Sequence, residues 1–157
     1  LMQADALSLF EQELLPMATL LTPNVPEAEL LADMTIDSVA AMEAAAQRIL
    51  AKGCQAVLIK GGHLAGDVKA DLLFQATGET ADFKAAHVET RNTHGTGCTL
   101  SSAITAQLAL GHPLTEAIWL AKRYLTEALR QGADVAIGKG HGPVNHFYQP
   151  LPLVKKP

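Results

Sequence analysis

The chain has 157 residues, which is the size of one domain or of part of a larger protein. It carries 12 basic and 16 acidic residues, for a net charge of −4, and 48% of its residues are hydrophobic. This composition is typical of a folded globular protein. An acidic chain without a basic cluster argues against a nucleic-acid-binding surface.

The sequence shows no pattern typical of a membrane-spanning helix or a secretory signal. No apolar run approaches the roughly 18 to 20 residues that a membrane-spanning helix needs. The first ten residues include Asp5 and lack the basic segment of a secretory signal. Cys54 and Cys98 are too few and too far apart to suggest a disulfide framework. We therefore expect a soluble, cytoplasmic protein that acts on neither a membrane nor a nucleic acid.

The sequence pattern of the first third of the chain predicts three helices, with a short strand between the first and the second. An amphipathic stretch ends at Pro16, and the apolar segment 18–22 is typical of a buried strand. Pro26 suits the first turn of a helix over 26–32, with Asn24 as its cap. A third helix is expected to be capped by Thr35 or Asp37 and to end at Gly53. Its predicted buried face comprises Val39, Met42, Ala46 and Ile49.

The remaining chain predicts strands first and helices after them. The continuous apolar run 56–59 is typical of a central parallel strand, and further strands are expected at 68–75 and 81–88. Helices are predicted from about Cys98 to Leu110 and from about Leu114 to Arg130. The segment 138–148 is rich in glycine and histidine and has no period. Strands alternating with helices indicate an α/β layered fold with a mostly parallel sheet.

Ligands bind beyond the carboxyl ends of the strands in such sheets. Three polar loops are expected there, at residues 22–27, 60–63 and 90–98. The candidate site is therefore sought in these loops.

The loop before Cys98 contains Gly95, Thr96 and Gly97, and a helix is predicted to begin directly after it. Glycines allow the backbone to approach a ligand closely, and the first amides of a helix have no partner within the helix. Together with the helix dipole, such amides can bind a phosphate or a developing anion. The alternative is a plain glycine turn capped by Thr96, because short Gly-x-Gly strings are common.

Cys98 would lie at or within the first turn of this helix, where the positive helix end favours a thiolate. Three interpretations remain open from the residues alone. The side chain could be a general base for a substrate hydroxyl, a covalent nucleophile, or a small buried residue without a chemical role.

Asn24 and Glu27 stand one helical turn apart after a strand end. An amide and a carboxylate so placed can hold water molecules on Mg²⁺, but the same pair is also typical of a capping box. Lys60 could bind phosphate as a point charge, or it could be a solvated lysine at the end of a strand. The spacing of the histidines fits no zinc site.

Taken together, these segments resemble the hydroxymethylpyrimidine/phosphomethylpyrimidine kinases of thiamine biosynthesis, which belong to the ribokinase-like vitamin kinases. The resemblance rests on residues 90–103, 21–29, 60–63 and 140–147, which match in the same order and span nearly the whole chain. It implies a three-layer α/β/α fold with a mostly parallel central sheet. Residues 1–149 would be the C-terminal, nucleotide-side part of one kinase domain, and residues 150–157 a tail.

The resemblance also implies an activity. ATP and Mg²⁺ would phosphorylate 4-amino-5-hydroxymethyl-2-methylpyrimidine and then its monophosphate, with a homodimer formed by the full-length enzyme. The chain begins with a leucine inside a helical pattern and is shorter than such kinases. We therefore expect the N-terminal part, with most of the pyrimidine contacts, to be missing and this part alone to be incomplete.

Site residues follow from the same resemblance. Residues Gly95, Thr96, Gly97 and Cys98 would form the anion hole, with Cys98 as catalytic base where the wider group has an aspartate. Glu27 would help to hold the metal. The nucleotide and its phosphates would be contacted by Asn24, Lys60, Gly61, Gly62 and His63.

Three other functions are kept as alternatives. The chain could belong to a pyridoxal or pyridoxine kinase of the same superfamily, or it could be a truncated nucleotide-binding module without activity. A cysteine hydrolase that uses Cys98 with a nearby histidine is the third.

Overall fold

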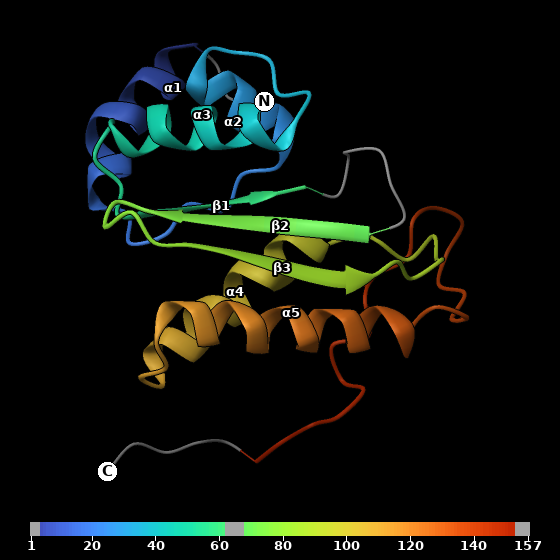
Figure 1. Cartoon of the computed structure of the whole chain (residues 1–157). Helices are drawn as coiled ribbons and strands as arrows, with labels where there is room; N and C mark the ends of the chain where they lie inside the picture. Colours follow the sequence, from blue (N-terminus) through green and yellow to red (C-terminus); the bar gives the residue numbers. More distant parts are fainter. Residues whose placement is uncertain (1–3, 62–67, 153–157) are drawn as a thin grey trace. The chain divides into compact units, whose positions relative to one another are not determined.

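The computed structural model describes residues 4–61 and 68–152 of the chain (Figure 1). The chain divides into two compact units, Leu1–Lys84 and Ala85–Pro157. Unit 1 contains helices and a sheet, and unit 2 is built mainly from two helices. None of the helices in the described ranges combines the length and the apolar character that crossing a bilayer requires.

Three helical segments form the helical layer of unit 1. The first is α1 (Ala4–Leu9), which continues into a π-helical turn, η1 (Phe10–Leu14), and a short 3₁₀ turn, η2 (Leu15–Met17). The others are α2 (Val25–Ala32) and α3 (Val39–Leu50). All three were expected from the sequence, within a few residues.

The start of α3 differs from the prediction that Thr35 or Asp37 caps it. Ser38 is the cap, because its extended backbone lets its hydroxyl accept a hydrogen bond from the amide of Ala41 at 3.2 Å. The helix therefore begins at Val39, whose side chain is 62% exposed rather than part of the buried face. The other predicted members of that face, Met42, Ala46 and Ile49, are buried.

The sheet has the order β1–β2–β3, with β1 (Ala56–Lys60), β2 (Val68–Gln75) and β3 (Thr80–Ala86). Ala56 pairs with Gln75 and Lys60 with Asp71, so β1 and β2 are antiparallel. The prediction of a mostly parallel sheet is therefore wrong for these two strands. The physical reason is the short link over 61–67, because a parallel crossover needs about a dozen residues or more.

Parallel pairing does occur where the sequence predicted the strand 18–22. That segment is too irregular to count as a strand, but Leu21 donates to the carbonyl of Ala56 at 2.9 Å and accepts from Leu58 at 2.8 Å. Further along, Lys60 donates to the carbonyl of Pro23 at 2.9 Å. Pro23 has no N–H group of its own, which limits the ladder to isolated bridges. These bonds bring residues 22–24 beside the carboxyl end of β1.

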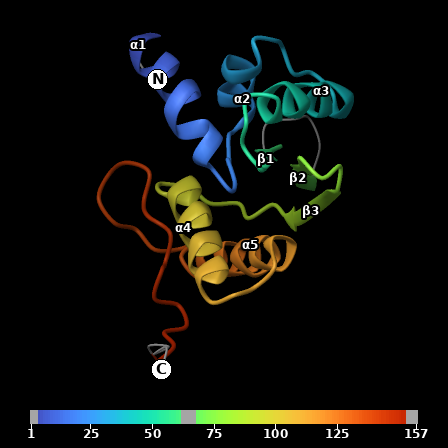
Figure 2. The same cartoon turned by 90° about the vertical axis from the view of Figure 1, so that its left-hand side faces the viewer.

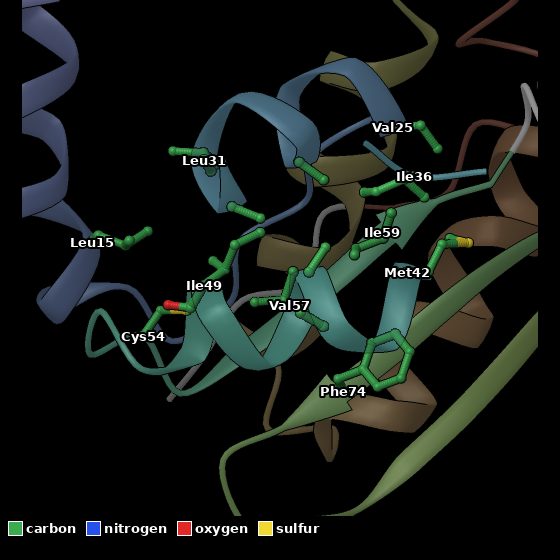
Figure 3. Packing of buried hydrophobic residues seen from close by; sticks show 14 residues of the cluster. Leu15, Val25, Leu31, Ile36, Met42, Ile49, Cys54, Val57, Ile59 and Phe74 are labelled. Atoms are coloured by element: carbon green, nitrogen blue, oxygen red, sulfur yellow. The ribbon is translucent and has the colours of Figure 1, made fainter. Parts of the chain in front are cut away.

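The core of unit 1 lies between α2, α3 and β1. Met42, Ile49, Val57 and Ile59 are fully buried in one cluster that also includes Phe74 of β2 (Figure 3). Burying an aliphatic side chain of this size contributes about 1.5 to 3 kcal/mol relative to leaving it exposed. This cluster holds the end of β1 in place, and with it Lys60 and the adjacent residues 22–24.

Gly61 continues from β1 into close contact with β2. Its amide donates to the carbonyl of Ala70 at 3.1 Å, and a Cβ atom at this position would lie 2.1 Å from that oxygen. We expect Gly61→Ala to lower the free energy of unfolding by about 1 to 3 kcal/mol, because backbone atoms cannot rotate away from the added methyl group. Denaturant unfolding measures the effect. Gly140→Ala is the control, since a Cβ there meets no atom within 4 Å; an equal loss in both variants would contradict the prediction.

Unit 2 is organised around α4 (Thr96–Ala109) and α5 (Leu114–Arg130), which pack against each other. Figures 1 and 2 both show the two helices side by side, joined by a short loop. Gly111 in this loop has φ 95°, a conformation that favours glycine. The buried side chains of the pair include Leu100 and Ile104 of α4 and Ala117, Ile118, Ala121 and Ala128 of α5.

Candidate active site

The start of α4 carries the predicted anion-binding segment. Gly95 is its N-cap, with φ 84° and ψ 4°, and no side chain caps this end of the helix. Thr96 is the first helical residue, so the alternative in which Thr96 is the cap is wrong. The amide of Thr96 donates to the carbonyl of Thr93 at 3.3 Å, and that of Thr99 to the carbonyl of Gly95 at 2.8 Å.

Two amides at the start of α4 are open, which means that their N–H groups have no hydrogen-bond acceptor among the described residues. In the described part of the chain, the N–H groups of Gly97 and Cys98 have no acceptor. Unpartnered amides at a helix start carry about half a unit of positive charge together with the helix dipole. This end of α4 can therefore bind a phosphate or stabilise a developing negative charge.

The two cysteines have opposite environments. Cys54 is buried in unit 1, and burial raises the pKa of its thiol. Its Sγ donates to the carbonyl of Ile49 at 3.7 Å. Cys98 is exposed in the first turn of α4. The interpretation of Cys98 as a small buried residue is therefore wrong, and a role as base or nucleophile remains a prediction.

Residues 142–146 lie along the start of α4 and are held there by hydrogen bonds. The sequence predicts no regular element for this segment. His94 donates through its amide to the carbonyl of Gly142 at 3.1 Å, next to a parallel bridge between His94 and Pro143. Further on, Nε2 of His146 lies 3.0 Å from Oγ1 of the buried Thr99. These bonds make Gly142, Pro143 and His146 part of the support of the anion-binding segment.

A hollow of about 890 Å³ borders Cys98 and Thr99 in unit 2. Its walls come from α4, α5 and residues 146–151, and they include the rings of Tyr124 and Tyr148, whose centroids are 5.6 Å apart. The hydroxyl of Tyr124 donates to the carbonyl of His146 at 3.0 Å. The exposed thiol therefore faces a space large enough for a small organic molecule.

Asn24 and Glu27 form a reciprocal capping box at the start of α2. The amide of Glu27 donates to Oδ1 of Asn24 and the amide of Asn24 donates to Oε2 of Glu27, both at 2.8 Å. The capping interpretation is thus confirmed. It leaves Oε1 of the exposed Glu27 without a partner among the described residues.

The donor set around Glu27 fits a water-rich Mg²⁺ site better than a closed metal cage. Within the described ranges, no group of three or more histidine, cysteine, aspartate or glutamate side chains could hold a metal ion. Mg²⁺ commonly keeps several waters and uses one or two carboxylates together with phosphate oxygens. One free carboxylate oxygen is compatible with that mode.

Lys60 lies beside Asn24, as the isolated parallel bridge between these two residues shows. It is half-buried, and its ammonium group has no acceptor among the described residues. Gly61 is buried against β2, so the structure gives it a packing role. The predicted residues Gly62 and His63 lie outside the described residues. The structure thus brings Asn24, Glu27 and Lys60 together in unit 1, whereas Gly95–Cys98 belong to unit 2.

An open, glycine-bounded helix start in an α/β fold is typical of proteins that bind phosphate groups. Over residues 1–145 the chain matches the family described as phosphomethylpyrimidine kinase. The chain belongs to this family. The resemblance to that family, based on residues 21–29, 60–63, 90–103 and 140–147, is therefore confirmed.

Curated relatives carry the same description. The chain is 46% identical over 151 residues to the hydroxymethylpyrimidine/phosphomethylpyrimidine kinase of Rhizobium meliloti, covering 95% of this chain and 56% of that protein. It is 45% identical over 147 residues to the thiamine biosynthesis bifunctional protein ThiED of Geobacter sulfurreducens, covering 94% of this chain and 29% of that protein. The chain spans 56% or less of the curated relatives it matches.

Solved structures confirm the ribokinase-like α/β fold. A pyridoxal kinase from Staphylococcus aureus in complex with AMP-PCP and pyridoxal is 34% identical, with a TM-score of 0.85 over 93% of this chain and 55% of that one. The phosphomethylpyrimidine kinase of Clostridium difficile 630 is 40% identical, with a TM-score of 0.69 over 82% of this chain and 51% of that one. Both kinds of vitamin kinase therefore share the fold of this chain.

Proposed function

We propose that the protein containing this chain transfers the γ-phosphoryl group of ATP to 4-amino-5-hydroxymethyl-2-methylpyrimidine, and in a second reaction to its monophosphate, in thiamine biosynthesis. The family match and the descriptions of the relatives support the reaction class. The structural observation that carries the proposal is the uncapped start of α4, where the amides of Gly97 and Cys98 are open.

In this proposal the start of α4 stabilises the transferring group. Phosphoryl transfer needs positioning and charge stabilisation more than covalent help from the protein. In the anion hole formed by Gly95–Cys98, the open amides of Gly97 and Cys98 donate to the phosphoryl oxygens as their charge develops. Cys98, as the general base, takes the proton of the substrate hydroxyl, whose oxygen bonds to phosphorus while the bond to ADP breaks.

The remaining proposed residues act on the nucleotide. Lys60 contributes a positive charge to the phosphates, with Asn24 beside it and residues 61–63 as the nucleotide loop. Glu27 would help to hold Mg²⁺, in part through water. When bound, Mg²⁺ supplies charge neutralisation on the phosphate oxygens. The domain would extend through residue 149, with residues 150–157 as its tail.

Glu27→Gln separates the metal role from the capping role, and we expect it to raise the Mg²⁺ concentration needed for half-maximal activity by about tenfold. The amide oxygen of glutamine can still accept from Asn24, as in other capping boxes, while the negative charge is lost. Activity is measured against Mg²⁺ at saturating ATP. Thermal unfolding is expected to be unchanged, and Glu29→Gln on the same helix serves as a charge-matched control. A Mg²⁺ titration that matches the wild type would contradict the metal role.

Pyridoxal phosphorylation is the second candidate function. It is supported by the structural similarity to pyridoxal kinases, with TM-scores of 0.83 to 0.85. Parallel assays of the full-length protein with ATP and each of the two alcohols distinguish the two activities. The proposal predicts a higher kcat/KM for the pyrimidine. Higher efficiency with pyridoxal would replace it, and nucleotide binding without transfer to either alcohol would indicate a module without activity.

A cysteine hydrolase has less support. Among the described residues, no histidine is hydrogen-bonded to the thiol of Cys98, and the nearby His146 contacts Thr99 instead. Nucleophilic cysteines in hydrolases are activated by such a base. A burst of acyl product would be the result that favours this alternative.

The proposal includes a cytoplasmic homodimer. Both cysteines are free, which suits a reducing compartment. Light scattering of the full-length protein would measure the assembly.

A further inference from the structure

The buried side chain of Asn92 joins the loop before α4 to the end of α5. Asn92 is 3% exposed, although asparagine is mostly a surface residue. Its Nδ2 atom donates to the carbonyl oxygens of Gly132 and Val135, each at 2.7 Å. Both hydrogens of the amide group are therefore used, and both acceptors belong to the turn that follows α5.

The opposite side of the same carboxamide is packed against Gly142. A Cβ atom at Gly142 would lie 2.1 Å from Oδ1 and 2.8 Å from Cγ of Asn92. The backbone of Asn92 is held as well, because its amide donates to the hydroxyl of Thr90 at 3.0 Å. The side chain is thus enclosed between two distant segments of unit 2, residues 132–135 and residue 142.

This fixed point lies three residues before Gly95, and the residues between them are also anchored. His94 donates to the carbonyl of Gly142 at 3.1 Å, and the carbonyl of Thr93 accepts from Thr96 at 3.3 Å. The direction in which the chain enters the left-handed Gly95 is therefore set by contacts that begin at Asn92. The open amides of Gly97 and Cys98 follow directly.

We infer that Asn92 is the positioning residue of the anion-binding start of α4. Asn92 uses its two donors on the carbonyls after α5, so its side chain acts through the backbone of Gly95–Cys98. It fixes the direction of those amides, and preorganised donors are effective because they need no rearrangement during the reaction. The inference rests on the proposed function for its kinetic consequence, whereas its structural consequence can be measured without turnover.

Asn92→Asp tests the inference with little change of shape. It replaces the donating NH₂ group with an oxygen that faces two carbonyl oxygens. We expect kcat of the full-length kinase to fall by about 10- to 100-fold, with the KM for ATP within about threefold of wild type. Asn145→Asp is the matched control, because the side chain of Asn145 loses only a 3.5 Å exposed bond to the carbonyl of Gln131. It should keep the wild-type kcat.

Gly142→Ala provides an independent route to the same effect, because its methyl group would push the carboxamide of Asn92 out of place. We expect Gly142→Ala to lower kcat when it is the single substitution. In an Asn92→Ala background it should have no further effect on kcat. Such non-additivity identifies two residues that act through one contact. Additive effects in the double variant would overturn the inference.

The amide resonances of Gly95 and Gly97 supply a readout that needs no activity. We expect Asn92→Asp to shift both resonances in ¹H–¹⁵N spectra and Asn145→Asp to leave them in place. Unshifted resonances in a folded Asn92→Asp protein would overturn the inference, whatever the assays show. Absence of turnover in the wild type would instead reject the proposed function, and the resonances would still decide the role of Asn92.

Discussion

Replacing Cys98 with alanine is expected to lower turnover by about 10² to 10⁴-fold, which is the usual contribution of a general base. The thiol is exposed in the first turn of α4, where removing it leaves the helix backbone unchanged. The open amides should therefore still bind phosphate. We expect the affinity for ATP to remain close to that of the wild type, so that the loss appears in kcat.

The assay compares kcat and the dissociation constant for ATP in the full-length protein. Ser102→Ala is the matched control, because Ser102 lies one turn further along α4 and borders the same hollow. Cys98→Asp offers a second comparison, since a carboxylate is also able to accept a proton and should restore part of the rate. Unchanged turnover in Cys98→Ala would remove Cys98 as the base.

Local sequence patterns predicted most helices and strands of this chain. The strand 68–75 was predicted with its observed bounds, and α3 and α5 were placed within a few residues. Side-chain periodicity determines such elements because it reports which face is buried. Strand direction follows other rules. A link as short as 61–67 permits an antiparallel partner for β1, and the apolar run of β1 carries no information about its direction.

The candidate site was predictable where its residues are close in sequence. Gly95–Cys98 and the Asn24–Glu27 pair are local motifs, and each lies at a helix start as expected. The role of Asn92 was missed, because its partners Gly132 and Val135 come about forty residues later, beyond the end of the predicted helix 114–130. The packing role of Gly61 was missed for the same reason, since the carbonyl of Ala70 belongs to another strand.

Gly95→Ala is expected to lower kcat by up to about 10²-fold, in the range that follows from the loss of one anion-hole donor. Gly95 has φ 84°, where an alanine costs about 1 to 2 kcal/mol. The substituted backbone relieves this strain by turning toward negative φ, which redirects the first amides of α4. Turnover and thermal unfolding of the full-length protein are measured together.

Gly111→Ala is the control that separates the loss of an amide donor at the start of α4 from the strain of an alanine at positive φ. Gly111 lies beyond the other end of the same helix with φ 95°, and a Cβ atom meets no neighbour within 4 Å at either glycine. The two variants should therefore lose similar stability, while only Gly95→Ala loses activity. If the two variants have equal rates, redirecting the first amides of α4 does not change the barrier to phosphoryl transfer. The start of α4 would then not contact the transferring phosphoryl group.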